Sequence, residues 1–228
     1  VKNTDQDKNA VTFFRISPDG ENGFPGEFEV SVTYELTEDN AIQIYYGGIS
    51  DKATVANMTN HSYFNLNGDP SKEGFDQVMY INADKFTPSD KLYIPTGEIK
   101  DVTGTPMDFR TPTEIGKKVD YNFEQIKNAT GYDHNWCLNT YKNGKGDDKT
   151  VCASLYSPKS GILLEVFTNE PGIQVYTGNF QGTGISCKHG IKYPKHVSVC
   201  FESQKYPDSP TKISQGVKDW TDATLKPG

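Results

Sequence analysis

The sequence predicts an all-β protein that folds as an antiparallel β-sandwich. Three observations indicate this class: apolar and polar residues alternate with a period of two in several short segments, helical periodicity is almost absent, and turn-forming residues separate the segments. The 21 glycines and 13 prolines among 228 residues fit short strands that are joined by tight turns. Because β-sandwiches often reach this length as one domain, we expect residues 1–228 to form a single domain.

The clearest strand is predicted at residues 28–36, where nine residues alternate between apolar and polar side chains. Residues 41–46 follow as a second strand after a turn at residues 37–40. Further strands are predicted at residues 77–82, 151–156, 162–168, 173–177 and 197–201. Residues 113–119 are the one segment for which a short helix is expected, directly after Pro112.

Charge and composition exclude several classes of partner. The formal net charge is −7, and a nucleic-acid surface would instead need a basic stripe. Arg15 and Arg110 are the only arginines, so few guanidinium groups are available to bind a phosphate in a bidentate manner. No apolar run approaches the length of a membrane span. We therefore expect neither nucleic acid nor a membrane as a partner.

The four cysteines are expected to be buried free thiols. They form no C-x-x-C pair and their spacing fits no zinc framework. The alternative is a disulfide between Cys137 and Cys152, which lie on successive strand candidates, and it would indicate an oxidising compartment. A cytoplasmic location is expected, with secretion as the alternative.

Glu202 lies at the end of a predicted strand, opposite an apolar face. The apolar face carries Val197, Val199 and Phe201, and the polar face carries His196, Ser198, Cys200, Glu202 and Gln204. If the apolar set packs into a core, the carboxylate of Glu202 faces a cleft. The alternative is a solvated side chain, which is the usual state of glutamate.

Residues 59–66 are a further strand candidate with polar side chains on both faces, including His61. Buried polar groups cost free energy unless they are bonded, so this segment should carry a polar network or line a site. His61 is thus a candidate acid, and the alternative is a structural histidine bonded to the backbone.

Two more segments carry candidate ligand groups. Asp133 and Asn135 share one face of residues 131–136, and a carboxylate and an amide bond sugar hydroxyls well. An Asx-type turn is the alternative. His134 faces the other way from Asp133, so the two side chains do not readily chelate one ion, and no metal is expected. Gln174 is a candidate to bond a ligand hydroxyl, or it faces water.

Four segments, in this order, resemble the aldose 1-epimerases, also called galactose mutarotases. They are residues 59–66 (TNHSYFNL), 131–135 (GYDHN), 171–180 (PGIQVYTGNF) and 201–210 (FESQKYPDSP). Weaker matches lie at residues 17–26, 95–99 and 108–110, so the likeness covers essentially the whole chain.

The resemblance implies a galactose mutarotase-like β-supersandwich that interconverts the α and β anomers of hexoses such as galactose and glucose without a cofactor. It implies Glu202 as the catalytic base, His61 as the catalytic acid, and Asp133 and Gln174 as sugar ligands. Family members extend further at the N-terminus. We therefore expect the fold to be incomplete at that end, with a companion chain or segment supplying the missing strands.

Two other functions remain open from the sequence. One is a hexose-6-phosphate 1-epimerase of related fold, which needs cationic groups for the phosphate and is opposed by the scarcity of arginine. The other is a non-catalytic carbohydrate-binding or structural module of the same fold. Comparing turnover of glucose with turnover of glucose 6-phosphate distinguishes an aldose 1-epimerase from a hexose-6-phosphate 1-epimerase. Sugar binding without turnover would identify the non-catalytic module.

Overall fold

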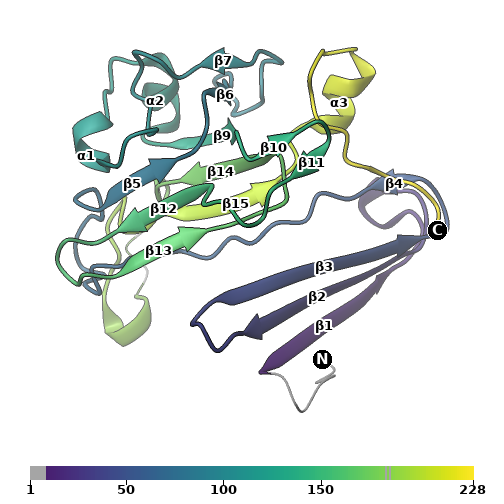
Figure 1. The fold of residues 1–228 in the computed structure, drawn as a ribbon, viewed down its shortest axis with the longest axis horizontal. Coiled ribbons are helices and arrows are strands. Elements are labelled where there is room, and N and C mark those ends of the chain that lie inside the picture. Colours follow the sequence, from purple (N-terminus) through teal and green to yellow (C-terminus); the bar gives the residue numbers. More distant parts are fainter. Residues whose placement is uncertain (1–8, 183, 185) are drawn as a thin grey trace. The chain divides into compact units, whose positions relative to one another are not determined.

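The chain forms two compact units, which are described separately (Figure 1). The computed structural model describes residues 9–182, 184 and 186–228. The first unit contains the residues up to Met58 together with Asp222–Gly228, and the second contains Thr59–Thr221. Every strand pair in the described part of the chain is antiparallel, which confirms the all-β class. That the chain forms a single domain stays a prediction.

The first unit is built on a three-stranded sheet in the order β1-β2-β3. Its elements are β1 (Ala10–Ser17), a 3₁₀ turn η1 (Glu21–Gly23), β2 (Phe28–Leu36), β3 (Ile42–Ser50), and the short pair β4 (Thr54–Val55) and β16 (Thr224–Leu225). β2 has the predicted bounds, whereas β3 continues past residue 46. In this continuation Gly48 lies against the ring of Phe28, at a position where a side chain would clash.

The second unit contains a four-stranded sheet, β13-β12-β5-β8, and a five-stranded sheet, β15-β14-β9-β6-β7. The strands of the first are β5 (Val78–Ile81), β8 (Thr113–Glu114), β12 (Ala153–Tyr156) and β13 (Leu163–Val166). Those of the second are β6 (Lys85–Thr87), β7 (Lys100–Asp101), β9 (Asp133–Cys137), β14 (Gly172–Tyr176) and β15 (Cys200–Gln204). A hairpin of β10 (Tyr141–Lys142) and β11 (Lys145–Gly146) and the short helices α1 (Ile115–Lys118), α2 (Glu124–Ala129), α3 (Ser209–Ser214) and η2 (Lys188–Gly190) complete the unit.

Side chains from both sheets of the second unit form one hydrophobic core. The four-stranded sheet contributes Met79, Ile81 and Leu155, and the five-stranded sheet contributes Phe86, Trp136, Ile173, Val175 and Phe201. The indole N–H of Trp136 donates to the carbonyl of Met107 over 3.0 Å, so its polar atom is satisfied inside the core. This packing covers one face of the five-stranded sheet, and Glu202, Gln174 and Asn135 of the same strands lie on the other face.

The strand expected at residues 59–66 is wrong. Within this segment Phe64 alone pairs, in an isolated bridge in which Phe64 and Val199 exchange two backbone hydrogen bonds of 2.9 and 2.8 Å. Asparagine side chains explain the difference, because Asn60 Oδ1 accepts from the Ser62 N–H and Asn65 Oδ1 accepts from the Asn67 N–H. Such local bonds compete with a strand ladder.

The helices are short. The segment expected to be helical at residues 113–119 begins as β8 and turns into α1 only at Ile115. No helix in the described ranges is both long enough and apolar enough to cross a membrane.

All four cysteines are free thiols, so the disulfide considered between Cys137 and Cys152 does not form. Cys152 and Cys200 are buried as expected, Cys137 is half-buried, and Cys187 is exposed, contrary to the expectation of burial.

Candidate functional site

Two rows of side chains cross the polar face of the five-stranded sheet, because the antiparallel register places them directly opposite one another. The first row is Glu202 on β15, Gln174 on β14 and Asn135 on β9, and the second is Cys200, Tyr176 and Asp133 on the same strands. Directly opposed residues share a face and lie within contact distance. β14 lies between β15 and β9, so it connects the two outer groups (Figure 1).

His61 lies beside Glu202, although the two residues come from distant parts of the chain. The bridge between Phe64 and Val199 holds the segment of His61 against the start of β15. His61 Nε2 is 3.4 Å from Glu202 Oε1. The Glu202 side chain is 11% exposed and that of His61 is 48% exposed. The carboxylate of Glu202 is therefore largely shielded from water, whereas the imidazole of His61 is accessible to solvent.

The imidazole of His61 is held between two tyrosine rings. It stacks on Tyr63 with a centroid distance of 5.0 Å, and its edge meets Tyr176 at 6.0 Å. The hydroxyl of Tyr176 accepts the backbone N–H of Phe180 over 2.9 Å, so this ring is itself anchored. The aromatic contacts fix the plane of the imidazole next to the carboxylate.

Asp133 and Gln174 also meet on this face, where Gln174 Nε2 donates to Asp133 Oδ1 over 2.8 Å. Two amide oxygens nearby, Gln174 Oε1 and Asn135 Oδ1, are buried without a hydrogen-bond partner. Buried polar atoms are nearly always bonded, so these two acceptors suit a hydroxyl-bearing ligand. All four predicted site residues, Glu202, His61, Asp133 and Gln174, thus lie on or against one face of the sheet.

Burial raises the pKa of Glu202 to about 7, and the carboxylate of Asp133 adds to the effect. Burial also raises the pKa of Asp133, while the amide of Gln174 and the imidazole of His61 oppose the increase. Glu202 can therefore gain and lose a proton near neutral pH, which is the property of an efficient general base.

His134 points away from this group, as its strand position predicted. It is buried against Phe86 and Trp136, and burial lowers its pKa to about 4. Its Nδ1 accepts the backbone N–H of Asp133 over 3.1 Å. His134 is thus a neutral histidine that supports the backbone of Asp133 from within the core.

Two residues of the face were not assigned a role from the sequence: Tyr176 and Cys200. The strand alternation already placed each on the same face as a predicted site residue, so strand phase was the signal that could have found them. Ligand atoms of Cys200, His61 and Glu202 all lie within 4.8 Å of one another, so within the described part of the chain this group could hold a metal ion.

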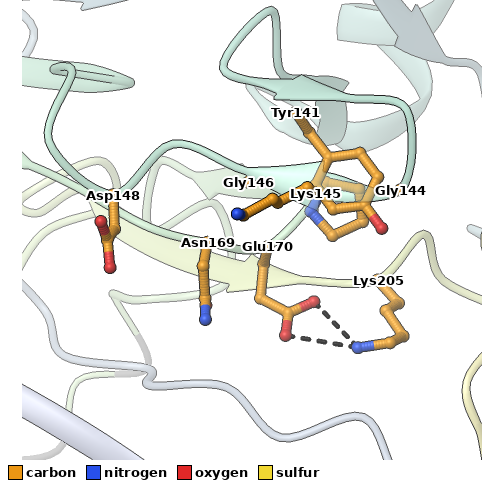
Figure 2. Close-up of a pocket in the computed structure, with 9 residues that line it drawn as sticks. Tyr141, Gly144, Lys145, Gly146, Asp148, Asn169, Glu170 and Lys205 are labelled. Atoms are coloured by element: carbon orange, nitrogen blue, oxygen red, sulfur yellow. Dashed lines mark hydrogen bonds and ion pairs between the residues drawn. The ribbon is translucent and has the colours of Figure 1, made fainter.

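A separate polar hollow of about 400 Å³ lies at the β10–β11 hairpin (Figure 2). Among the residues around it, Lys205 Nζ pairs with Glu170 at 3.1 and 3.3 Å. None of the four predicted site residues lines this hollow. It is therefore distinct from the site on the sheet face.

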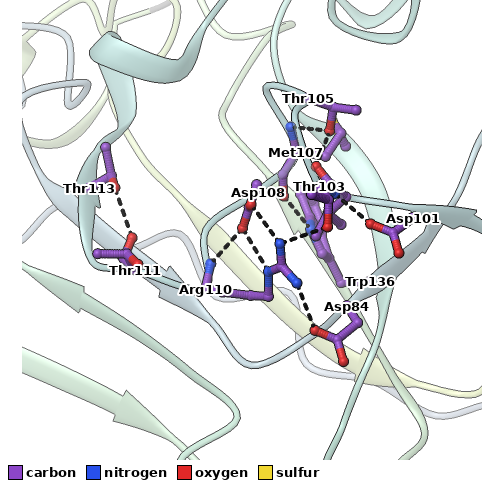
Figure 3. A network of polar contacts seen from close by, with 11 residues as sticks. Asp84, Asp101, Thr103, Thr105, Met107, Asp108, Arg110, Thr111, Thr113 and Trp136 are labelled. Carbon is purple, nitrogen blue, oxygen red and sulfur yellow. Dashed lines mark hydrogen bonds and ion pairs between the residues drawn. The ribbon is translucent and has the colours of Figure 1, made fainter.

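Both arginines are engaged by carboxylates. Arg110 donates to Asp108, to Asp84 and to Thr103, and the two carboxylates, Asp108 first, raise its pKa (Figure 3). Arg15 pairs with Glu21. Neither guanidinium is paired with Glu202 or Asp133, so neither arginine neutralises a carboxylate on the polar face.

Comparison with known proteins identifies the family. The sequence model described as Aldose 1-epimerase matches residues 1–228. Galactose mutarotase of Mus musculus is 43% identical over 221 residues, which cover 96% of this chain and 60% of the relative. Galactose mutarotase of Homo sapiens is 45% identical over 201 residues, which cover 88% and 56%. Aldose 1-epimerase of Escherichia coli is 37% identical over 225 residues, which cover 98% and 62%.

Solved structures show the same fold. An aldose epimerase homologue from C. elegans superposes with a TM-score of 0.80 at 26% identity, covering 96% of this chain and 62% of the other. A galactose 1-epimerase from Lactobacillus acidophilus superposes with a TM-score of 0.79 at 30% identity, covering 98% and 60%. The chain spans about 60% of the length of the mouse relative. With a family match over its full length, this chain belongs to the aldose 1-epimerase family.

Proposed function

We propose that the protein is an aldose 1-epimerase that interconverts the α and β anomers of aldohexoses such as galactose and glucose. The observation that carries this proposal is the pairing of Glu202, whose pKa is about 7, with His61 at 3.4 Å. A base that titrates near neutral pH, an imidazole beside it and adjacent hydroxyl-binding groups meet the needs of anomer exchange.

Anomer exchange requires two proton transfers in each direction. Glu202 removes the proton of the C1 hydroxyl while protonated His61 donates one to the ring oxygen, and the bond between C1 and the ring oxygen breaks. The open aldehyde rotates about its C1–C2 bond. On closure the roles reverse, so both residues return to their initial states. Each positioned group contributes about 10²–10⁴-fold to such a reaction.

The remaining polar groups would orient the sugar. Asp133 and Gln174 bond hydroxyls, and the two buried amide oxygens of Gln174 and Asn135 supply acceptors. The ring of Tyr63 is 52% exposed and offers an apolar surface to the C–H face of a sugar. The proposed steps use protons alone and need neither a nucleotide nor a metal ion.

The two alternative functions are less well supported. A hexose-6-phosphate 1-epimerase needs cations for the phosphate, and both arginines are held by carboxylates elsewhere. The relatives compared above are named galactose mutarotases or aldose 1-epimerases. A non-catalytic module is disfavoured by the pairing of Glu202 with His61. The companion chain or segment and the cytoplasmic location stay predictions.

The proposal is tested by following the optical rotation of freshly dissolved α-D-glucose or α-D-galactose. The protein should accelerate the approach to the anomeric equilibrium, and Glu202→Gln or His61→Asn should each reduce the enzymatic rate by at least about 10²-fold.

The matched control is Glu170→Gln, because Glu170 pairs with Lys205 in the separate hollow. This variant should keep the wild-type rate. A near-normal rate in either site variant, with both sugars, would contradict the assignment of base and acid.

A further inference from the structure

Three metal-binding side chains of different chemistry converge on the polar face: the imidazole of His61, the thiol of Cys200 and the carboxylate of Glu202. Their ligand atoms all lie within 4.8 Å of one another. Cys200 and Glu202 are two residues apart on β15, so their side chains point to the same side. His61 approaches from the segment that the Phe64–Val199 bridge holds against this strand.

These separations are close to those of a zinc site. Zinc binds cysteine sulfur at about 2.3 Å and histidine nitrogen or carboxylate oxygen at about 2.0–2.2 Å, so tetrahedral ligand atoms lie roughly 3.3–3.8 Å apart. The distance of 3.4 Å between His61 Nε2 and Glu202 Oε1 already fits. The other two separations are at most 4.8 Å, about 1 Å beyond this range, and side-chain rotation can reduce them. Three protein ligands leave one position for water.

The charges around the three ligands also favour a cation. Glu202 and Asp133 bring two carboxyl groups to the face, and among the ion pairs of the described residues neither has a lysine or arginine partner. His61 is half exposed and gives an ion access from solvent. A ligand set of sulfur, nitrogen and one carboxylate selects Zn²⁺ over Mg²⁺ or Ca²⁺, which prefer oxygen alone.

We propose that His61, Cys200 and Glu202 form a Zn²⁺ site that overlaps the base and the acid, so that bound zinc inhibits the protein. When the ion binds, the Cys200 S–H bond breaks, an S–Zn bond forms and the proton passes to solvent. His61 Nε2 and the carboxyl of Glu202 also give any proton that they carry to solvent, and then bind zinc through the imidazole lone pair and a carboxylate oxygen. Neither group can then exchange a proton with a sugar. The inhibition rests on the proposed function, whereas the binding does not.

Binding is tested by titrating the 228-residue chain with Zn²⁺ in a calorimeter and with Co²⁺ in a spectrophotometer. The expected result is one equivalent of metal, with a sulfur-to-cobalt charge-transfer band in the near ultraviolet. Cys200→Ala should abolish the band and weaken zinc binding at least about tenfold, and the exposed-cysteine control Cys187→Ala should change neither. Mg²⁺ should produce no binding heat.

An unchanged affinity and band in Cys200→Ala, or no saturable zinc binding by the wild type, would overturn the site. Circular dichroism establishes whether the variant is folded. If Cys200→Ala does not fold, His61→Ala serves instead, since this half-exposed ligand can be removed without opening the core. His61→Ala should weaken zinc binding at least about tenfold, and an unchanged affinity refutes the proposal.

Inhibition is measured separately by optical rotation. Zinc should slow the wild type and Cys187→Ala, sugar should compete with it, and Cys200→Ala should need at least about tenfold more zinc for half-inhibition. Wild-type zinc sensitivity in folded Cys200→Ala would refute the inhibitory site. A protein that binds one zinc but never turns over sugar would instead refute the proposed function while leaving the metal site intact.

Discussion

Glu202 combines two properties that oppose each other, since it is a carboxylate that must ionise and it lies in a largely buried position. Its strand phase and its assignment as the base could both be reached before the structure, the first from alternation and the second from the family resemblance. The pKa of Glu202 could not be predicted from the sequence, because it depends on burial and on Asp133. Asp133 belongs to a strand two positions away in the sheet.

The raised pKa predicts a stability cost at neutral and alkaline pH. Between the ordinary pKa of 4.5 and the folded value of about 7, the folded protein binds more protons at Glu202 than the unfolded chain does. Stability from this group therefore falls as pH rises through that window. Glu202→Gln removes the cost, and a gain of about 1 kcal/mol at pH 8 would raise Tm by roughly 2–4 °C.

Thermal unfolding at pH 8 and pH 4 measures this effect. The gain of Glu202→Gln over the wild type should be present at pH 8 and disappear at pH 4, where the native carboxyl is already neutral. Glu170→Gln should show no gain at pH 8, because its carboxylate is paired with Lys205. A gain of equal size at both pH values would show that ionisation of Glu202 is not its cause.

His61 and Cys200 show the limits of residue-level prediction. The family resemblance paired His61 with Glu202, and the two side chains lie 3.4 Å apart, although the strand expected around His61 was wrong. Asparagine side chains bond the local backbone there, and alternation alone does not reveal that competition. Cys200 was expected only as a buried thiol, because a cysteine on a strand looks the same whether or not a distant histidine approaches it.

At the scale of elements, β14 holds the site together, because it pairs with β15 on one side and β9 on the other. It begins at Gly172, which lies next to the amide of Asn135 and the ring of Tyr206. A Cβ at Gly172 would lie 2.4 Å from Asn135 Oδ1 and 3.0 Å from Tyr206 Cδ1. The close approach of β14 to its neighbours therefore requires glycine at this position.

Gly172→Ala should destabilise the protein by about 1–3 kcal/mol, since overpacking a buried site forces its neighbours to move. Chemical denaturation measures the loss. The control is Gly47→Ala, where the added Cβ meets only the hydroxyl of Ser31, a group that can rotate away. Equal stability of Gly172→Ala and the wild type would show that β14 and Asn135 are not packed as described.

Strands whose residues alternate in polarity could be predicted even when they have four or five residues, as in β5, β12 and β14, whereas β1 and the two-residue strands could not. β2 has its predicted bounds because nine residues alternate without interruption. β7 and β8 contain two residues each, too few to show a period. The order of strands within each sheet also lies beyond periodicity, because alternation identifies the face of a strand and not its neighbours.

At the scale of the whole molecule, the candidate residues all belong to the second unit, Thr59–Thr221. One face of its five-stranded sheet carries the core, and the other carries Glu202, Gln174 and Asp133, with His61 beside Glu202. The fold class followed from composition and alternation, and the solved structures confirm it over nearly the whole chain. The division into two units could not be predicted, because alternation of polar and apolar residues identifies strands and not the boundary between units.

The pH dependence of kcat/KM for anomer exchange tests the central claim most directly, namely that buried Glu202 is the base. Burial places its pKa at about 7, so kcat/KM should fall below pH 7 as the carboxylate becomes protonated. The fall should be tenfold for each pH unit well below that value. A rate that stays constant down to pH 5, with its acid limb near the ordinary glutamate pKa, would contradict the account.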